Sequence, residues 1–593
     1  MPSHLPSPLS DTLIDPTRRR LALSAPLALV LGACGGGGGG SSSSSDTGST
    51  SGGSSGGSTG GTTAGTVLGT DASGADVAPP TTTLVGAWRL ETGANAIDTA
   101  AALTHHRLAV ALGTGAVSSG SASLVVGATV AGRTEVSLAG STVVVLQAEA
   151  LGLTVTSTLP ATARLELALS GSGTQTVTVH SEQDYRLALE GVTLASTDGP
   201  ALNLQSRQRA FVVLTGSNTL SDSSTYTART GPDGSAMDLK AALFAEGPLL
   251  LSGTGSLAIT SAAKHGLASD AHVRLSSGTL NVQAVKKDGV RANHAFVMDG
   301  GSLTVTTPAG KGIKVEGKED ATAAVGFIAI NAGTLVITSH DKAITASWEG
   351  AEDGSTSATT DDPDPRVTIN GGTLTITTTG TPFEDTNLTD GDSSLSPEGI
   401  EGKSSVTING GTLVINTTDD AINAGKAIVI NGGRILARAS RNDAIDSNGT
   451  LTLNGGLVIA DGASGAEGGL DCDNNTFTVT GGTFIGLGGR NSSVTASAAT
   501  QNCVTLRTVP AGLLVLRDAN GKPAFAFTMP RAASAVVLSS PLLQTGISLT
   551  PVSGGTLAAG GAEFNALVQN AGTHSGGAAL ASAVTIAARV TAF

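Results

Sequence analysis

A short pattern that is written twice in succession between Glu398 and Asp446 constrains the fold more than any other feature of this chain. The stretch reads EGIEGKSSVTINGGTLVINTTDDAINAGKAIVINGGRILARASRNDAID. Each unit has an apolar strand that ends in Asn-Gly-Gly, a second strand of the Thr-Leu-Val-Ile kind, and a polar corner with an acidic residue before Ala-Ile or Gly-Ile. Repetition of so short a unit predicts an architecture in which each unit covers its neighbour.

The aliphatic or aromatic residue that follows the turn gives the period. The steps between successive occurrences are 23, 23, 32, 39, 39, 22, 23 and 26 residues, which sets a base unit of 22 or 23 residues with insertions at corners. That unit is too short for a propeller blade and matches one turn of a β-solenoid. The residues that follow the turn, which we expect to stack as a ladder, are Leu257, Leu280, Leu303, Leu335, Leu374, Leu413, Ile435, Val458 and Phe484.

Alternation within one coil predicts which side chains face the core. In the coil from Thr412 to Gly433, we expect three short strands and three corners. The residues expected to point inward are Leu413, Ile415, Ile422, Ile428 and Ile430, and those expected to point outward are Thr412, Val414, Asn423 and Val429. The fold class is therefore all-β, a parallel β-helix with three-strand coils of 22–23 residues.

The ends of the chain differ from this repeat. Arg18-Arg19-Arg20, an apolar run to Leu31 and the segment Leu31-Gly32-Ala33-Cys34 have the layout of a lipoprotein signal, in which Cys34 is lipidated. We expect a signal peptide at 1–33, a Gly/Ser-rich flexible linker at 34–83, an N-terminal β region at 84–175, the parallel β-helix at 176–490 and a small C-terminal β cap at 491–593.

The net charge of the chain limits the kinds of partner that it can bind. A net charge of −14 disfavours nucleic acid and anionic membrane surfaces, because both require basic patches that displace counterions. We expect a monomer that touches the membrane only through its lipid anchor, at the outer membrane or cell surface of a bacterium, with the periplasmic face as an alternative.

Acidic residues gather where successive coils stack at the small-aliphatic pair. Like charges about 5 Å apart on neighbouring coils repel unless a cation neutralises them, and calcium takes oxygen ligands in irregular geometry. The alternative is a solvated acidic face at an external corner. The candidate ligands are Glu398, Glu401, Asp419, Asp420, Asn423, Asp443, Asp446, Asp471 and Asp473.

In the earlier coils the equivalent corner is basic. A stacked basic strip can grip the carboxylates of an acidic sugar polymer, and Trp348 in an insertion can stack on a sugar ring. The alternative for the strip is charge balance against nearby acids. The candidate glycan-binding residues are Lys287, Arg291, Lys311, Lys314 and Trp348, and no motif for a catalytic residue is present.

Two further cysteines, Cys472 and Cys503, remain in what we expect to be an exported chain. Such a pair predicts a disulfide, with two separate thiols as the alternative.

The chain from about Val177 to Gly554 resembles the bacterial carbohydrate-binding domain-containing proteins. The likeness lies in Leu189–Leu194, Gly216–Leu220, the Ile-Asn-Gly-Gly-Thr-Leu units at Ile369 and Ile408, Pro397–Gly402, Asp420–Asn423, Met529–Ala532 and Ser539–Pro541. The resemblance implies a pectate-lyase-like, right-handed parallel β-helix that binds calcium and acidic or neutral plant polysaccharides without established lyase activity. The chain departs from the family pattern at Lys264, Lys287 and Lys311, where acidic corners are common.

These observations predict an extracytoplasmic lipoprotein that binds acidic, pectin-like or cellulose-like glycans through a calcium-loaded β-helix without cleaving them. The first alternative is a polysaccharide lyase acting on uronate polymers, with Arg291 or Lys314 as the base if either faces the metal. The second alternative is a structural adhesin or stalk.

Overall fold

The computed structural model describes residues 104–317, 326–348, 365–383 and 395–593, apart from residues 559, 562, 569 and 570. The predicted signal peptide, Cys34, the linker and the first part of the N-terminal region lie outside the described residues. So do residues 318–325, 349–364 and 384–394, which fall within the longer steps of the repeat count. Among the described residues, no helix has the length and apolarity needed to cross a membrane.

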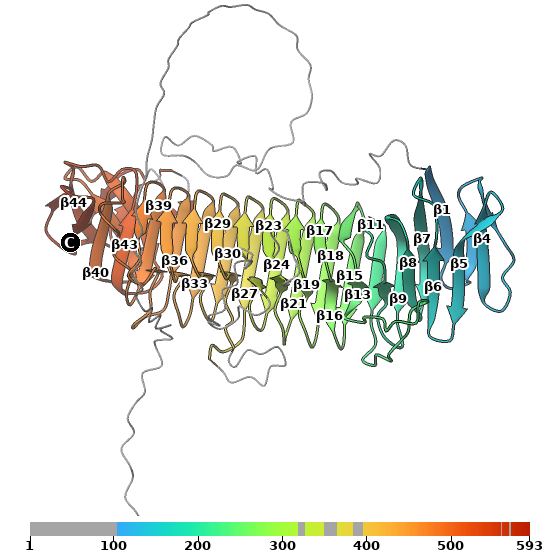
Figure 1. The fold of residues 1–593 in the computed structure, drawn as a ribbon. Helices are drawn as coiled ribbons and strands as arrows, with labels where there is room; N and C mark the ends of the chain where they lie inside the picture. Colours follow the sequence, from blue (N-terminus) through green and yellow to red (C-terminus); the bar gives the residue numbers. More distant parts are fainter. Residues whose placement is uncertain are drawn as a thin grey trace, which may run out of the picture. The chain divides into compact units, whose positions relative to one another are not determined.

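Three parallel stacks of short strands form the middle of the chain, and each coil contributes one strand to each stack (Figure 1). Stack A contains β8 (Thr176–Ser181), β10 (Leu202–Leu204), β13 (Ala241–Ala245), β16 (His265–Ser269), β19 (Val290–Ala292), β22 (Ile313–Gly317), β25 (Ile344–Trp348), β28 (Ile400–Gly402), β31 (Ile422–Ala424), β34 (Ile445–Ser447) and β37 (Leu470–Asp471).

Stack B follows stack A in every coil. It contains β11 (Ala210–Thr215), β14 (Leu249–Gly253), β17 (His272–Leu275), β20 (Ala295–Met298), β23 (Phe327–Ile330), β26 (Arg366–Ile369), β29 (Ser405–Ile408), β32 (Ala427–Ile430), β35 (Thr450–Leu453) and β38 (Phe477–Val479).

Stack C completes the coil. It contains β12 (Ser217–Ser221), β15 (Ser256–Ser261), β18 (Thr279–Ala284), β21 (Ser302–Thr307), β24 (Thr334–Ser339), β27 (Thr373–Thr378), β30 (Thr412–Thr417), β33 (Arg434–Ala439), β36 (Leu457–Asp461) and β39 (Thr483–Gly488). The long strand β9 (Tyr185–Ala195) pairs with both β11 and β12 and so joins stacks B and C into one sheet.

The strand register confirms the predicted parallel β-helix. Leu257 pairs with Leu280, and the same ladder continues without a slip to the pair Val458 and Phe484. In stack A the aliphatic residues that follow the polar corner pair in the same way, from Val290 and Ile313 to Ile445 and Leu470.

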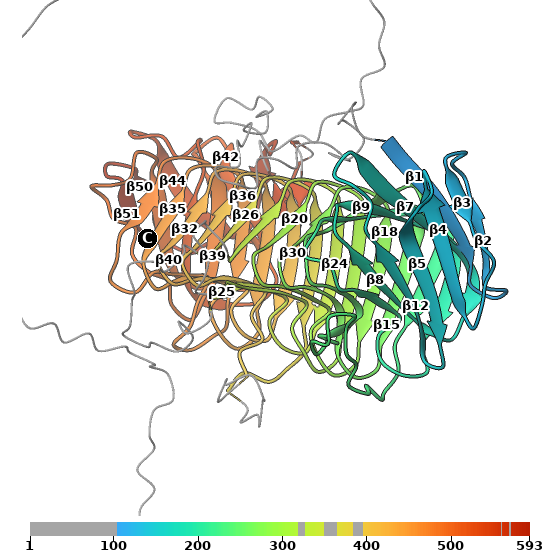
Figure 2. The ribbon, with the colours of Figure 1, turned by 45° about the vertical axis from the view of Figure 1, so that its right-hand side comes forward.

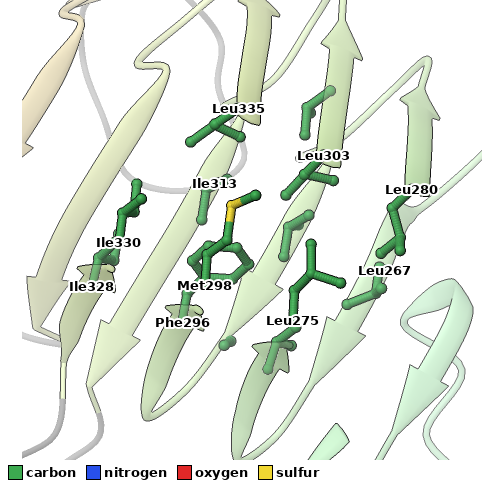
Figure 3. Packing of buried hydrophobic residues seen from close by; sticks show 14 of the residues in the cluster. Leu267, Leu275, Leu280, Phe296, Met298, Leu303, Ile313, Ile328, Ile330 and Leu335 are labelled. Carbon is green, nitrogen blue, oxygen red and sulfur yellow. The ribbon is translucent and has the colours of Figure 1, made fainter. Parts of the chain in front are cut away.

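The core consists of the inward side chains of all three stacks. The five residues predicted to point inward in the coil from Thr412 are fully buried, and the four predicted to point outward are partly exposed. Figure 3 shows Leu267 from stack A, Leu275 from stack B and Leu280 from stack C turned toward one interior. Each buried Leu or Ile contributes about 2 to 3 kcal/mol of hydrophobic free energy, so the ladder is the main source of stability.

The second glycine of Asn-Gly-Gly has a specific role between stacks B and C. Gly411 has a φ of 94°, and a Cβ there would lie 2.9 Å from the carbonyl oxygen of Gly372 in the neighbouring coil. The corner therefore requires glycine for both its backbone conformation and its close approach. The preceding asparagines form a side-chain ladder, in which Asn431 donates to Asn409 at 2.7 Å and Asn454 donates to Asn431 at 2.9 Å.

Both ends of the helix are covered. At the N-terminal end, β3 to β6 pair in antiparallel fashion and β6 then pairs with β8 in parallel, while β1 pairs with β2 and β7 (Figure 2). Parallel pairing thus begins before residue 176. The strands of this end are β1 (Thr104–Ala111), β2 (Ala116–Ser119), β3 (Leu124–Val126), β4 (Arg133–Leu138), β5 (Ser141–Glu149), β6 (Gly152–Ser157) and β7 (Ala163–Gly173).

The C-terminal end carries the predicted antiparallel cap. Strand β43 pairs with β39 of stack C, and cap residues share a second buried cluster with Leu436, Ile459 and Ile485 on the outer face of that stack. The cap strands are β40 (Cys503–Val509), β41 (Gly512–Arg517), β42 (Pro523–Met529), β43 (Ala533–Ser539), β44 (Ser548–Ser553), β45 (Thr556–Leu557), β46 (Glu563–Phe564), β47 (Leu567–Val568), β48 (His574–Ser575), β49 (Ala578–Ala579), β50 (Val584–Thr585) and β51 (Val590–Ala592).

Candidate metal and glycan site

Most of the predicted site residues lie at the corner between stacks C and A, or on the stack A strand that follows it. One position of this corner directly precedes the small-aliphatic pair, and a second is the outward residue of the stack A strand. Parallel register places the second position of successive coils side by side, as for Asn423 and Asp446 and then Asp446 and Asp471. The corner is therefore a column of polar residues along the helix.

Three carboxylates of this column come together in the last coils. One carboxylate oxygen from each of Asp443, Asp446 and Asp471 lies within 4.8 Å of the others. Asp443 is buried and the other two are partly exposed, so the group opens toward solvent on one side. We call these three residues the acidic cluster.

The carboxyl groups of the acidic cluster have no basic partner among the described residues. Burial, followed by the charge of Asp446, raises the pKa of Asp443 to about 9. Burial, followed by the charges of Asp471 and Asp473, raises the pKa of Asp446 to about 7. Across the part of the chain that the structure describes, no lysine or arginine forms an ion pair with any of the three cluster residues.

The preceding coil extends the cluster with further oxygen atoms. Burial and the charge of Asp446 raise the pKa of Asp420 well above its usual value. One oxygen of Asp420 accepts a hydrogen bond from the backbone N–H of Asp443 at 3.0 Å, and the other accepts one from Asn423 at 3.0 Å. Asp419 accepts from Ser396 at 3.1 Å and from Asn442 at 2.8 Å, so both of its oxygens have protein donors.

Asp473 stands at the exposed edge of the cluster. It has a φ of 51°, and its backbone N–H donates to an oxygen of Asp471 at 3.2 Å. The same oxygen of Asp471 accepts from the backbone N–H of Cys472 at 2.9 Å and from the hydroxyl of Ser492. These three donors hold one oxygen of Asp471 in place and so define the orientation of its carboxylate.

Two other predicted metal ligands bind a lysine instead. Lys342 lies 2.7 Å from Glu398 and 3.2 Å from Glu401, and Lys403 lies 3.0 Å from Glu401. Burial raises the pKa of Glu398 to about 8 against the opposing effect of Lys342, whereas the two lysines hold the pKa of Glu401 below its usual value in spite of burial. The structure therefore separates these two glutamates from the acidic cluster by their counterions.

The basic strip of the earlier coils is mostly internal. Lys311 and Lys314 are each 2 % exposed, and they pair with Asp341 at 3.0 Å and Glu316 at 2.8 Å. A buried ammonium group cannot lie on a polymer in solvent. Burial and ion pairing favour the charge-balance alternative for these two lysines over the predicted glycan contact.

The other predicted glycan residues occupy different surroundings. Lys287 is exposed, and Arg291 pairs with Glu316 and lies 3.8 Å from Asp288. Trp348 ends β25, and its side chain lies outside the described residues. The basic strip thus presents no continuous row of exposed charges within the described coils.

A second group of acids escaped the sequence analysis. Asp238, Glu246 and Asp270 also bring one oxygen each within 4.8 Å, and parallel pairing of β13 with β16 places Glu246 beside Asp270. Lys240 lies 2.7 Å from Asp238 and 2.6 Å from Asp270, so this group already has a cation. The signal in the sequence was an acid directly after each of two neighbouring stack A strands, Glu246 after β13 and Asp270 after β16. It was missed because the repeat is less regular in this part of the chain.

The predicted disulfide is absent from the structure. Cys472 and Cys503 are both buried free thiols. The sulfur of Cys472 faces the carbonyl of Asn475 at 3.7 Å, and that of Cys503 faces the carbonyl of Gln501 at 3.8 Å. The two thiols lie on different elements, β40 and the segment after β37, and each has its own polar neighbour.

The donor set of the acidic cluster fits a hard divalent cation. Calcium binds oxygen at about 2.3 to 2.6 Å, so ligand oxygens on opposite sides of the ion lie about 5 Å apart, which matches the spacing of the three carboxylates. The raised pKa values of Asp443 and Asp446 show that deprotonation is costly there without a cation. Among the other predicted acids, Glu398 and Glu401 have lysine partners, and both oxygens of Asp419 and of Asp420 accept from protein donors.

Two comparisons with known proteins gave a match. Residues 152–444 match the family model of carbohydrate-binding domain-containing proteins. A solved structure of a polysaccharide lyase-like protein from C. thermocellum, a gadolinium derivative, matches 55 % of this chain and 97 % of its own at 16 % identity, with a TM-score of 0.34. No curated protein has significant sequence similarity to the chain. The matched segment 152–444 runs from β6 through the basic strip to the start of the acidic cluster, and this segment is similar to the carbohydrate-binding domain-containing family.

Proposed function

We propose that this protein is a calcium-dependent polysaccharide-binding lipoprotein. The observation that carries the proposal is the acidic cluster, three uncompensated carboxylates on a β-helix of a carbohydrate-binding family. Asp443, Asp446 and Asp471 would hold the ion, with Asp420 and Asn423 beside them. A bound calcium ion neutralises the cluster and offers open coordination positions to sugar hydroxyl or carboxylate oxygens.

The cluster supports binding better than cleavage. A lyase needs an available base beside the metal-bound sugar. The two residues considered for that role, Arg291 and Lys314, form ion pairs with Glu316 several coils away from the acidic cluster. We therefore propose a binding protein that acts at the outer membrane or cell surface through a lipid anchor on Cys34.

The test is retention on a panel of immobilised polysaccharides, once with calcium and once with a chelator. We expect retention on at least one polymer in calcium and its loss in chelator. The variant Asp446→Asn should behave in calcium as the native chain behaves in chelator. Failure of the native chain to bind any polymer under both conditions would overturn the proposal and favour a structural adhesin or stalk.

A further inference from the structure

An open pocket with a volume of about 470 Å³ lies where the cap meets the outer face of stack C. Its floor is formed by β30, β33 and β36, which contribute Asn416, Arg438 and Asp461. These three residues occupy equivalent positions on neighbouring coils, since Asn416 pairs with Arg438 and Arg438 with Asp461. Arg531, from the turn between β42 and β43, forms the opposite side. We call this the cap groove.

The cap groove contains two guanidinium groups and one carboxylate. Arg531 donates to Asp461 at 2.9 Å and to the carbonyl of Gly462, and the Nε of Arg438 lies 3.7 Å from Asp461. Asp461 is 12 % exposed, whereas the side chains of Arg438 and Arg531 are 44 % and 35 % exposed. The carboxylate is thus largely covered while both cations remain open to solvent, and the groove has a net positive charge on a protein with a net charge of −14.

The surface that leads to the cap groove is neutral and rich in hydroxyl groups. The outward residues of stack C at the groove's own register position are Ser221, Thr260, Gln283, Thr306, Thr338, Thr377 and Asn416. Each is exposed or partly exposed. A polymer lying along this face meets uncharged hydrogen-bonding groups until it reaches Arg438, where the cap closes the face.

The cap groove also adjoins the corner that holds the acidic cluster. Its lining includes Ser440 and Ala463, and the backbone N–H of Ala463 donates to the carbonyl of Asn442, directly before Asp443, at 2.9 Å. A single extended chain can therefore contact both features. A neutral sugar would form hydrogen bonds with the hydroxyl-rich face, but only an anionic sugar would also pair with the two exposed guanidinium groups.

We propose that the cap groove is a binding subsite for a sugar carboxylate, so that the polymer recognised by this protein is a uronate-containing polysaccharide. Arg438 and Arg531 donate to the carboxylate, and Asp461 holds Arg531 in place for that contact. The pocket volume lies within the usual range for small ligands and accommodates a sugar ring. The inference rests on the proposed polysaccharide binding and adds to it a substrate class and a site separate from the metal.

The experiment measures binding of oligogalacturonate by titration calorimetry, in calcium and in chelator, against the same oligomer with methyl-esterified carboxyl groups. We expect Arg438→Gln and Arg531→Gln each to weaken binding of the acidic oligomer about tenfold in calcium. The esterified oligomer should bind the native chain and both variants with the same low affinity. Arg434→Gln is the matched control, because Arg434 is exposed on the same strand but does not line the groove.

Equal affinity of the native chain, Arg438→Gln and Arg531→Gln for the acidic oligomer would overturn the subsite, as would equal affinity for the esterified oligomer. Loss of binding in chelator with unchanged binding by both variants in calcium would overturn it while the proposed calcium-dependent function stands. Binding that survives chelator but falls in both variants would support the subsite and contradict the role of calcium. Melting curves of the variants exclude unfolding of the cap as the cause.

Discussion

The same corner of the repeat is neutralised in two different ways along this β-helix. In the coils of β19 to β28, which we call the lysine-paired region, acids such as Asp341 and Glu398 bind buried lysines. In the coils of β31 to β37 the acidic cluster has no such partner among the described residues. The backbone register is continuous through both regions, so the difference lies in side-chain charge alone.

The two regions show how one repeat accommodates buried acids with and without an internal counterion. Burial acts to raise the pKa of Glu316, but Lys314 and Arg291 outweigh it and hold that pKa below its usual value. Where no lysine is present, burial raises the pKa of Asp443 instead. An internal ammonium group neutralises a buried acid without an external ligand, whereas its absence leaves a place that an external cation can fill.

The largest expected effect is the loss of a lysine from the lysine-paired region. Lys342→Met leaves Glu398 and Glu401 buried beside each other without their shared cation. Breaking a buried ion pair costs about 3 to 5 kcal/mol, so the free energy of unfolding should fall by that amount. Denaturant titration measures it, with the exposed Lys426→Met as the control. A loss no greater than that of the control would show that the two regions are not neutralised differently.

The next effect is the response of the acidic cluster to calcium. At a calcium concentration about 100 times its dissociation constant, binding adds about 2.7 kcal/mol to the stability of the native chain. Asp446→Asn removes one ligand charge and should abolish most of that gain, while it stabilises the metal-free protein by relief of repulsion. Melting curves with calcium and with chelator measure both changes. The exposed Glu149→Gln should leave both unchanged, and an unaltered calcium response in Asp446→Asn would place the ion elsewhere.

The acidic cluster should depend on pH in the opposite direction to Asp288 and Glu316 of the lysine-paired region. The folded-state pKa values of Asp443, about 9, and Asp446, about 7, lie above the usual 3.8, so the folded protein binds more protons than the unfolded chain in that window. Stability of the metal-free cluster therefore falls as pH rises from about 4 to 9. The pKa values of Asp288 and Glu316 are lowered, so their contribution is lost as pH falls below their usual values of 3.8 and 4.5.

Denaturation midpoints of the metal-free protein between about pH 5 and pH 8 test whether its stability falls as pH rises. The midpoint should fall with rising pH in chelator, and calcium should restore it most strongly at the upper end, because calcium binds the deprotonated carboxylates. A midpoint that rises with pH in chelator would contradict uncompensated charge in the acidic cluster.

The sequence was sufficient to predict the strand register, but not which charged side chains are buried and paired. The ladder from Leu257 to Phe484 could be predicted because one glycine-rich turn recurs at the same place in each coil. The acids at Asp443, Asp446 and Asp471 followed from the same count. Burial of Lys311 and Lys314 did not, because an outward position at a corner can still be covered by its neighbours.

The cap groove could not be predicted from the sequence for a different reason. Arg531 meets Asp461 across 70 residues of chain, through a cap that has no repeat and folds back on the outer face of stack C. No period relates the two residues, and a basic residue in a turn usually faces solvent. The structure has Cys472 and Cys503 as separate buried thiols, which is the alternative to the predicted disulfide.

The smallest expected effect is one in which the two regions should not differ. The asparagine ladder runs through both of them, with Asn409 accepting from Asn431 at 2.7 Å and Asn431 accepting from Asn454 at 2.9 Å. Asn409→Ala and Asn431→Ala should each cost about 2 kcal/mol of unfolding free energy, because each change removes two ladder hydrogen bonds and a hydrogen bond between neutral groups has a usual net value of about 1 kcal/mol. Neither loss should change with calcium or with pH, because no charged group takes part. A calcium-dependent cost at Asn431 alone would show that the cluster is coupled to the stack B corner, and the contrast between the regions would then extend beyond the acids themselves.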